Sequence, residues 1–151
     1  MKQTLIVFSI LALLSVSCRG TARKTTQADN QEQRMQVVQT KDFSMTLAQT
    51  EYTIPVDMVK LAIKNNTESE AYLNEYYDIE ILNGSEWKRI PLELAFIDIA
   101  YSLEAGASHE FEIALYPDKY NYKPGKYRIR KNVMTELENF ELAGEFVLKA
   151  E

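Results

Sequence analysis

Few side chains in this sequence could carry out chemistry. Its 151 residues include one Cys and one His. The single Cys18 can form neither an internal disulfide nor a cysteine-based zinc cage. The single His109 excludes a multi-histidine metal site, and no Ser and Asp are arranged around it as a catalytic triad requires. We therefore expect a non-enzymatic protein with no metal and no cofactor.

Cys18 lies just after an apolar segment near the start of the chain. Lys2 gives a short positive region, and residues 5–16 are apolar apart from two serines. At about 1.5 Å per residue this run covers roughly 18 Å, which is too short for a membrane core of about 30 Å. The pattern is typical of a secretory signal peptide.

The residues that end this segment resemble the lipobox of bacterial lipoproteins. They read Ser15-Val16-Ser17-Cys18, with Ser15 where the family usually has Leu. The resemblance implies that residues 1–17 are a lipoprotein signal peptide and that the Cys18 thiol carries a diacylglycerol. Such a lipid would hold the protein at a membrane of the bacterial cell envelope. The alternative is a plain secretory signal followed by a cysteine that becomes buried.

Tyrosines are concentrated in one short stretch. Tyr116, Tyr120 and Tyr122 fall in the run Tyr-Pro-Asp-Lys-Tyr-Asn-Tyr, which we expect to form a loop with exposed rings. Tyrosine is an efficient contact residue, because it is large and has few rotatable bonds. The loop could bind an unknown protein or glycan partner. Alternatively, its rings pack over the end of the domain.

Basic residues form the clearest charge feature. Lys126, Arg128 and Arg130 alternate, so they project from one face of a strand, with Lys131 nearby. Such a stripe could bind an acidic partner, a glycan or a phosphate. The whole chain is acidic, with a net charge of -5, and no exposed aromatic residues alternate with these basic residues. We therefore expect no nucleic-acid partner.

Two regions with different composition follow Cys18. Residues 19–41 are polar and carry five basic and two acidic residues, a charge of +3. With little apolar surface to bury, residues 18–41 cannot offset the entropy of ordering, so we expect a lipid-anchored flexible tether. Residues 42–151 carry 11 basic and 20 acidic residues, a charge of -9, and are expected to form one domain.

In residues 42–151, apolar and polar residues alternate with a period of two, which predicts half-buried strands. The pattern covers residues 43–47, 52–54, 59–63, 77–82, 111–115, 127–130 and 146–148. Asn83-Gly84 predicts a type I′ hairpin turn between residues 77–82 and 87–90, and Pro124-Gly125 predicts a type II turn. Residues 92–103 are open to either a strand or a helical turn. These short strands, separated by turns, indicate an all-β antiparallel sandwich.

Five motifs resemble those of bacterial immunoglobulin-like (Ig-like) domains of the kind found on envelope lipoproteins. They begin at Val59, Asn83, Leu103, Pro124 and Glu145, and include the runs Asn83-Gly84-Ser85-Glu86-Trp87 and Pro124-Gly125-Lys126-Tyr127. Their order and spacing imply an Ig-like β-sandwich of about seven strands over residues 42–151. They also imply a binding or accessory module without catalytic residues. The alternative is a proteinase inhibitor that presents the loop Tyr116–Pro124.

Ig-like topology also implies roles for particular residues. Tyr127 would form a tyrosine corner, with its ring buried and its hydroxyl bonded to a nearby backbone group. Its strand would lie beside the strand at Tyr77, so that Asp78 and Glu80 face Arg128 and Arg130. The basic stripe is then expected to be paired within the domain, which favours the loop Tyr116–Tyr122 as the contact surface for a partner.

Overall fold

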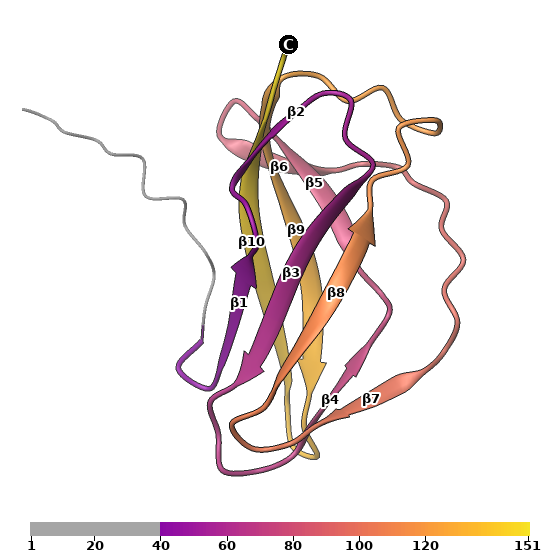
Figure 1. The fold of residues 1–151 in the computed structure, drawn as a ribbon. Coiled ribbons are helices and arrows are strands. Elements are labelled where there is room, and N and C mark those ends of the chain that lie inside the picture. The colour runs from indigo at the N-terminus through magenta and orange to yellow at the C-terminus, as the bar shows by residue number, and fades with distance from the viewer. Residues whose placement is uncertain (1–39) are drawn as a thin grey trace, which may run out of the picture. The chain divides into compact units, whose positions relative to one another are not determined.

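A computed structural model describes residues 40–151, and this part of the chain consists of strands and loops (Figure 1). The predicted signal peptide, Cys18 and the predicted tether up to residue 39 lie outside the described residues. Ten strands follow one another: β1 (Phe43–Leu47), β2 (Glu51–Thr53), β3 (Met58–Asn65), β4 (Ala71–Asn74), β5 (Asp78–Asn83), β6 (Glu86–Arg89), β7 (Ala100–Leu103), β8 (Ser108–Ala114), β9 (Gly125–Met134) and β10 (Asn139–Lys149).

The strands form two facing sheets, as the alternating pattern predicts. The smaller sheet has the order β1-β3-β8, and the larger has the order β2-β10-β9-β4-β7, with β5 and β6 joined to it beside β9. All pairs are antiparallel except β2 with β10. The all-β Ig-like sandwich is therefore confirmed. The described residues form ten strands rather than about seven, because β4, β6 and β7 add to the seven runs that the alternation marks.

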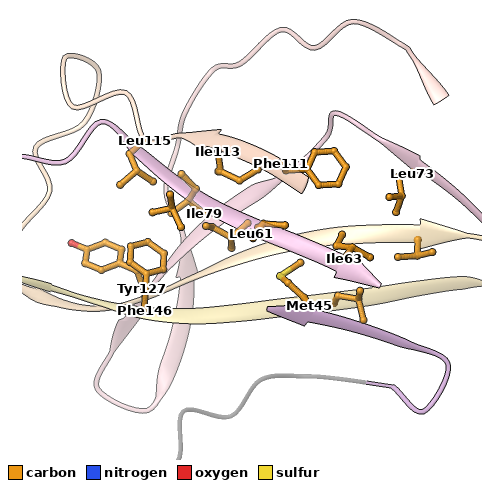
Figure 2. Packing of buried hydrophobic residues seen from close by; sticks show 14 of the residues in the cluster. Met45, Leu61, Ile63, Leu73, Ile79, Phe111, Ile113, Leu115, Tyr127 and Phe146 are labelled. Atoms are coloured by element: carbon orange, nitrogen blue, oxygen red, sulfur yellow. The ribbon is translucent and has the colours of Figure 1, made fainter. Parts of the chain in front are cut away.

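The core lies between the sheets and is built from the alternate residues that the sequence pattern marks as apolar (Figure 2). Leu61 and Ile63 of β3 face inward, and so do Phe111 and Ile113 of β8. From the other sheet, the ring of Tyr127 stacks on Phe146, with ring centroids 5.7 Å apart. Burial of such apolar side chains stabilises each by about 1.5–3 kcal/mol.

A glycine permits the close approach of β1 to β10. A Cβ at Gly144 would lie 3.0 Å from the Met45 sulfur and 3.1 Å from the Leu47 side chain. Both contacts are tighter than most packing contacts in proteins, so a larger residue would require these β1 side chains to shift by a few tenths of an ångström. The absence of a side chain at this position lets the two sheets meet along their shared border.

Two turn types differ from those that the sequence predicts. The hairpin of β5 and β6 is present, but Asn83 pairs with Glu86, so the central turn residues are Gly84 and Ser85. Only Gly84 of these has a positive φ, 65°, which is the pattern of a type II′ turn, so type I′ is wrong. The type II turn at Pro124-Gly125 is also wrong, because Gly125 lacks the positive φ and already begins β9.

The ambiguous residues 92–103 contain both irregular and extended structure. Residues 91–99 form no regular element, and residues 100–103 form β7, which pairs with β4. In Figure 1 the irregular segment descends beside β8 before it reaches β7. The strand alternative is thus right for the last four residues only, and no helical turn forms.

Tyr127 makes the corner that Ig-like topology implies. Its ring is fully buried, its hydroxyl donates to the Lys123 carbonyl oxygen at 2.8 Å, and the Lys123 N–H donates back at 3.2 Å. Burial raises the pKa of Tyr127 above its ordinary value. The two bonds fix the chain just before β9, and the predicted structural role of Tyr127 is confirmed.

We expect Tyr127→Ala to lower the free energy of unfolding by about 3–5 kcal/mol, because the change removes a fully buried ring from the core. Chemical denaturation of the two proteins measures the difference. The matched control is Tyr76→Ala, since that ring is 44% exposed and its loss should cost below about 1 kcal/mol. Equal losses at the two positions would contradict the structural role of Tyr127.

Candidate functional site

The loop between β8 and β9 folds back on itself at Tyr116. Tyr116 has a φ of 53°, a left-handed conformation that turns the chain sharply at the end of β8. Its carbonyl oxygen accepts hydrogen bonds from the N–H groups of Lys119 and Tyr120, at 2.9 and 3.1 Å. The exposed tip consists of residues 117–119. The loop therefore presents a compact turn to solvent.

The tyrosines of this loop point largely inward, which contradicts the expected exposure of their rings. Tyr122 is 6% exposed and donates its hydroxyl to the Leu115 carbonyl oxygen at 2.7 Å. Its ring packs against Tyr120 and Tyr127, with centroids 4.9 and 5.6 Å away. Tyr116 and Tyr120 are half-buried. The rings attach the loop to the core, and any binding role of Tyr116, Tyr120 and Tyr122 stays a prediction.

The basic stripe on β9 is paired within the domain, as expected. Arg128 Nε and Arg130 Nη1 both bond the Glu80 carboxylate, the second at 2.7 Å, and Arg130 also bonds Glu141. Lys126 lies 3.2 Å from Glu145. Asp78 lies opposite Arg130 in register, but its carboxylate pairs with Arg89 at 2.6 Å instead. The expected partner Glu80 is thus confirmed, whereas Asp78 is not a partner of the stripe.

Glu80 is the centre of this face. Its side chain is 7% exposed, between two arginines that are 19% and 29% exposed. Burial alone would raise the pKa of the Glu80 carboxyl, but hydrogen bonds from Arg130 and Arg128 outweigh it and hold the pKa below its usual value. The Arg128 guanidinium also lies 4.5 Å from the centre of the Trp87 ring. The arginines are already engaged, and a role of Arg128 and Arg130 in binding a partner stays a prediction.

Lys131 follows the basic stripe in the sequence, but it points to the opposite side of β9 and is only 2% exposed. Its ammonium donates to the carbonyl oxygens of Asn74 and Tyr76, at 2.7 and 3.0 Å, and lies 3.9 Å from the centre of the Phe111 ring. Burial lowers the pKa of Lys131 to about 8, although the nearby negative charge of Glu75 acts to raise it.

A groove beside β8 was not expected from the sequence. It has a volume of about 310 Å³ and lies between the end of β8 and the irregular segment that precedes β7. Apolar and aromatic side chains make up most of its wall, together with two glutamates: Ala95, Phe96, Ile97, Ile99, Tyr77, Tyr101, Tyr116, Ala114, Glu75 and Glu112. Ile97 is 71% exposed.

Within residues 40–151 no cluster of His, Cys, Asp or Glu could hold a metal ion.

Comparison with known families gives one decisive match. The model of a family described as a bacterial Ig-like domain matches residues 39–147, most of the chain. The chain belongs to this bacterial Ig-like domain family. The match covers all of the strands except the last two residues of β10, and agrees with the sandwich that the strands form.

Several solved structures are similar to this chain at low identity. A β-glucosidase of Erythrobacter marinus is 14% identical (TM-score 0.41), over 71% of this chain and 15% of its own. The periplasmic chaperone SfaE is 16% identical (TM-score 0.42), over 72% and 56%. A structural-genomics target, SoR45, is 12% identical (TM-score 0.44), over 74% and 89%. The chain thus spans only part of the first two proteins. No curated protein matches the chain.

The burial of Lys131 predicts a dependence of stability on pH. An unfolded lysine keeps its ordinary pKa near 10.4, so above about pH 8 the unfolded chain binds more protons than the folded one. The contribution of Lys131 to the free energy of unfolding should therefore rise with pH. Relative to Lys131→Met, the wild type should gain roughly 2–3 kcal/mol between pH 7 and pH 10.

Denaturant unfolding of both proteins at each pH measures this difference. The buried tyrosines titrate in both, so their contribution cancels. The matched control is Lys88→Met, a change at an exposed lysine of β6, for which the difference from wild type should stay flat. A flat difference for Lys131→Met would contradict the lowered pKa.

Proposed function

We propose that this protein is a non-enzymatic binding or accessory module of the bacterial cell envelope, held at a membrane by a lipid on Cys18. The family assignment supports the module itself, since the described residues form one Ig-like sandwich. The location is argued from the sequence. The observation that carries it is the position of the sole cysteine, between a short apolar run and a polar segment that leads into the domain.

The chemistry of the lipid supports a lasting attachment. Each buried CH₂ of an acyl chain contributes about 0.8 kcal/mol, so several chains on one cysteine hold a protein at a bilayer almost permanently. Among residues 40–151 no helix is long and apolar enough to cross a membrane. In this proposal the polar residues 18–41 separate the acidic domain from the lipid surface.

The segment of charge +3 before the domain fits this arrangement. Anionic lipid headgroups attract basic residues close to the surface and repel acidic ones, within a Debye length of about 8 Å at physiological salt. The domain, with a charge of -9, would be held away from the same surface. Its edges and loops would then be free to meet a partner.

We expect that cells fed an alkyne fatty acid incorporate the label into the wild-type protein and not into Cys18→Ser. The wild type should also need detergent for its release from membranes. The matched control is Ser17→Ala, which changes the neighbouring residue but keeps the thiol and should still be labelled. Label that survives in Cys18→Ser, or release of the wild type without detergent, would contradict the proposal.

A further inference from the structure

The outer edge of β8 lacks a strand partner within the described residues. β8 pairs with β3 alone, in a register that places Leu61 opposite Phe111. On the other side, where a further strand could pair, lies the irregular segment before β7. Strand edges with free N–H and C=O groups are templates for pairing with another chain.

Particular backbone groups of β8 face this open side. The Leu115 N–H donates to Asp57 and the Ala107 carbonyl oxygen accepts from Asn65, so the odd-numbered residues of β8 bond toward β3. Because successive residues of a strand alternate sides, the backbone groups of Glu110 and Glu112 point outward. The Ala114 carbonyl also points outward, and it accepts the Tyr77 hydroxyl at 2.9 Å.

The groove lies next to these groups and gives them an apolar neighbour. Its walls include Phe96 and Ile97, and Ile97 and Ile99 are 71% and 42% exposed, which is unusual for such large apolar residues. An added strand whose backbone bonds β8 would place alternate side chains toward this groove. Backbone pairing and apolar contacts would thus be made by one extended segment.

The charge at the edge of β8 favours a basic peptide segment as the added strand. Glu110 and Glu112 are exposed on the outer face of β8, and Glu75 lines the groove. Lys60 is their cationic neighbour on β3, and it lies 2.7 Å from Glu112. The edge therefore carries a net negative charge. A second copy of β8 would bring glutamates opposite glutamates, which is unfavourable, whereas Lys or Arg would be attracted.

We propose that the edge of β8 binds an extended peptide segment of a partner protein, in which basic residues alternate with apolar ones. The segment adds a fourth strand to the β1-β3-β8 sheet. Its basic side chains meet Glu110 and Glu112, and its apolar side chains enter the groove at Ile97. This partner chemistry rests on the proposed binding function, but it does not depend on the lipid at Cys18.

The test uses the full chain in detergent micelles and the capped peptide Thr-Lys-Val-Arg-Val-Lys-Thr. We expect saturable binding, and at least tenfold slower hydrogen exchange of the Glu110 and Glu112 amides in the complex. N-methylation of the peptide at alternate residues should abolish binding for one set of residues and not for the other, because only alternate N–H groups can face β8. A peptide with Glu in place of Lys and Arg should not bind.

Protein variants locate the site. Ile97→Asp and the double change Glu110→Lys, Glu112→Lys should each weaken binding at least tenfold. Leu137→Asp, at a residue that is 92% exposed and outside the groove, should leave binding unchanged. Unprotected Glu110 and Glu112 amides, equal effects of the two N-methylated peptides, or peptide-independent dimers at this edge would each overturn the proposal. Acylation of Cys18 is unaffected by these outcomes, so either proposal can fail alone.

Discussion

The bonds of Lys131 to two backbone carbonyls hold the irregularity on which this sandwich depends. Leu73 pairs with Val133 and Asp78 pairs with Arg130, so residues 74–77 lie opposite only residues 131 and 132. The extra residues form a bulge, and the Lys131 ammonium donates to the carbonyl oxygens of Asn74 and Tyr76 within it. A hydrogen bond from a charged donor contributes about 1.5–3 kcal/mol, so the two bonds offset part of the cost of burying the lysine.

The bulge decides which strands pair on each side of it. Before it, β4 pairs with β7, and after it, β5 pairs with β6. Since β7 is paired with β4 in the larger sheet, it does not cover β8 in the smaller one, and the edge of β8 stays open. The Tyr77 hydroxyl crosses from the end of the bulge to the Ala114 carbonyl and ties the two sheets together beside that edge. The open edge thus follows from the pairing of a strand in the opposite sheet.

The sequence predicts the strands well because period two is a local property. The inward residues of β3, β8 and β9 are those that the alternation marks, and Tyr127 is where its motif places it. Lys131 shares the parity of Tyr127 and Ile129, so the signal for its burial was present, but its charge suggested solvent. Asp78 and Tyr122 were misjudged for another reason. Their partners, Arg89 and Leu115, are set by strand register and loop packing, which a single strand pattern does not contain.

The two polar surfaces of the domain differ in what a partner must disrupt. On β9 the arginines already share the buried Glu80, and a ligand that took Arg128 or Arg130 would leave a carboxylate with few partners in a poorly hydrated place. Breaking one side of such a pair is costly, by several kcal/mol in buried cases. At the edge of β8, the backbone groups of Glu110 and Glu112 are open to water and need only exchange it for a strand. The same carboxylates that repel a second copy attract a basic segment. A basic segment would compete there with Lys60 for Glu112, but that pair is exposed and contributes little, so the edge is favoured over the more highly charged face.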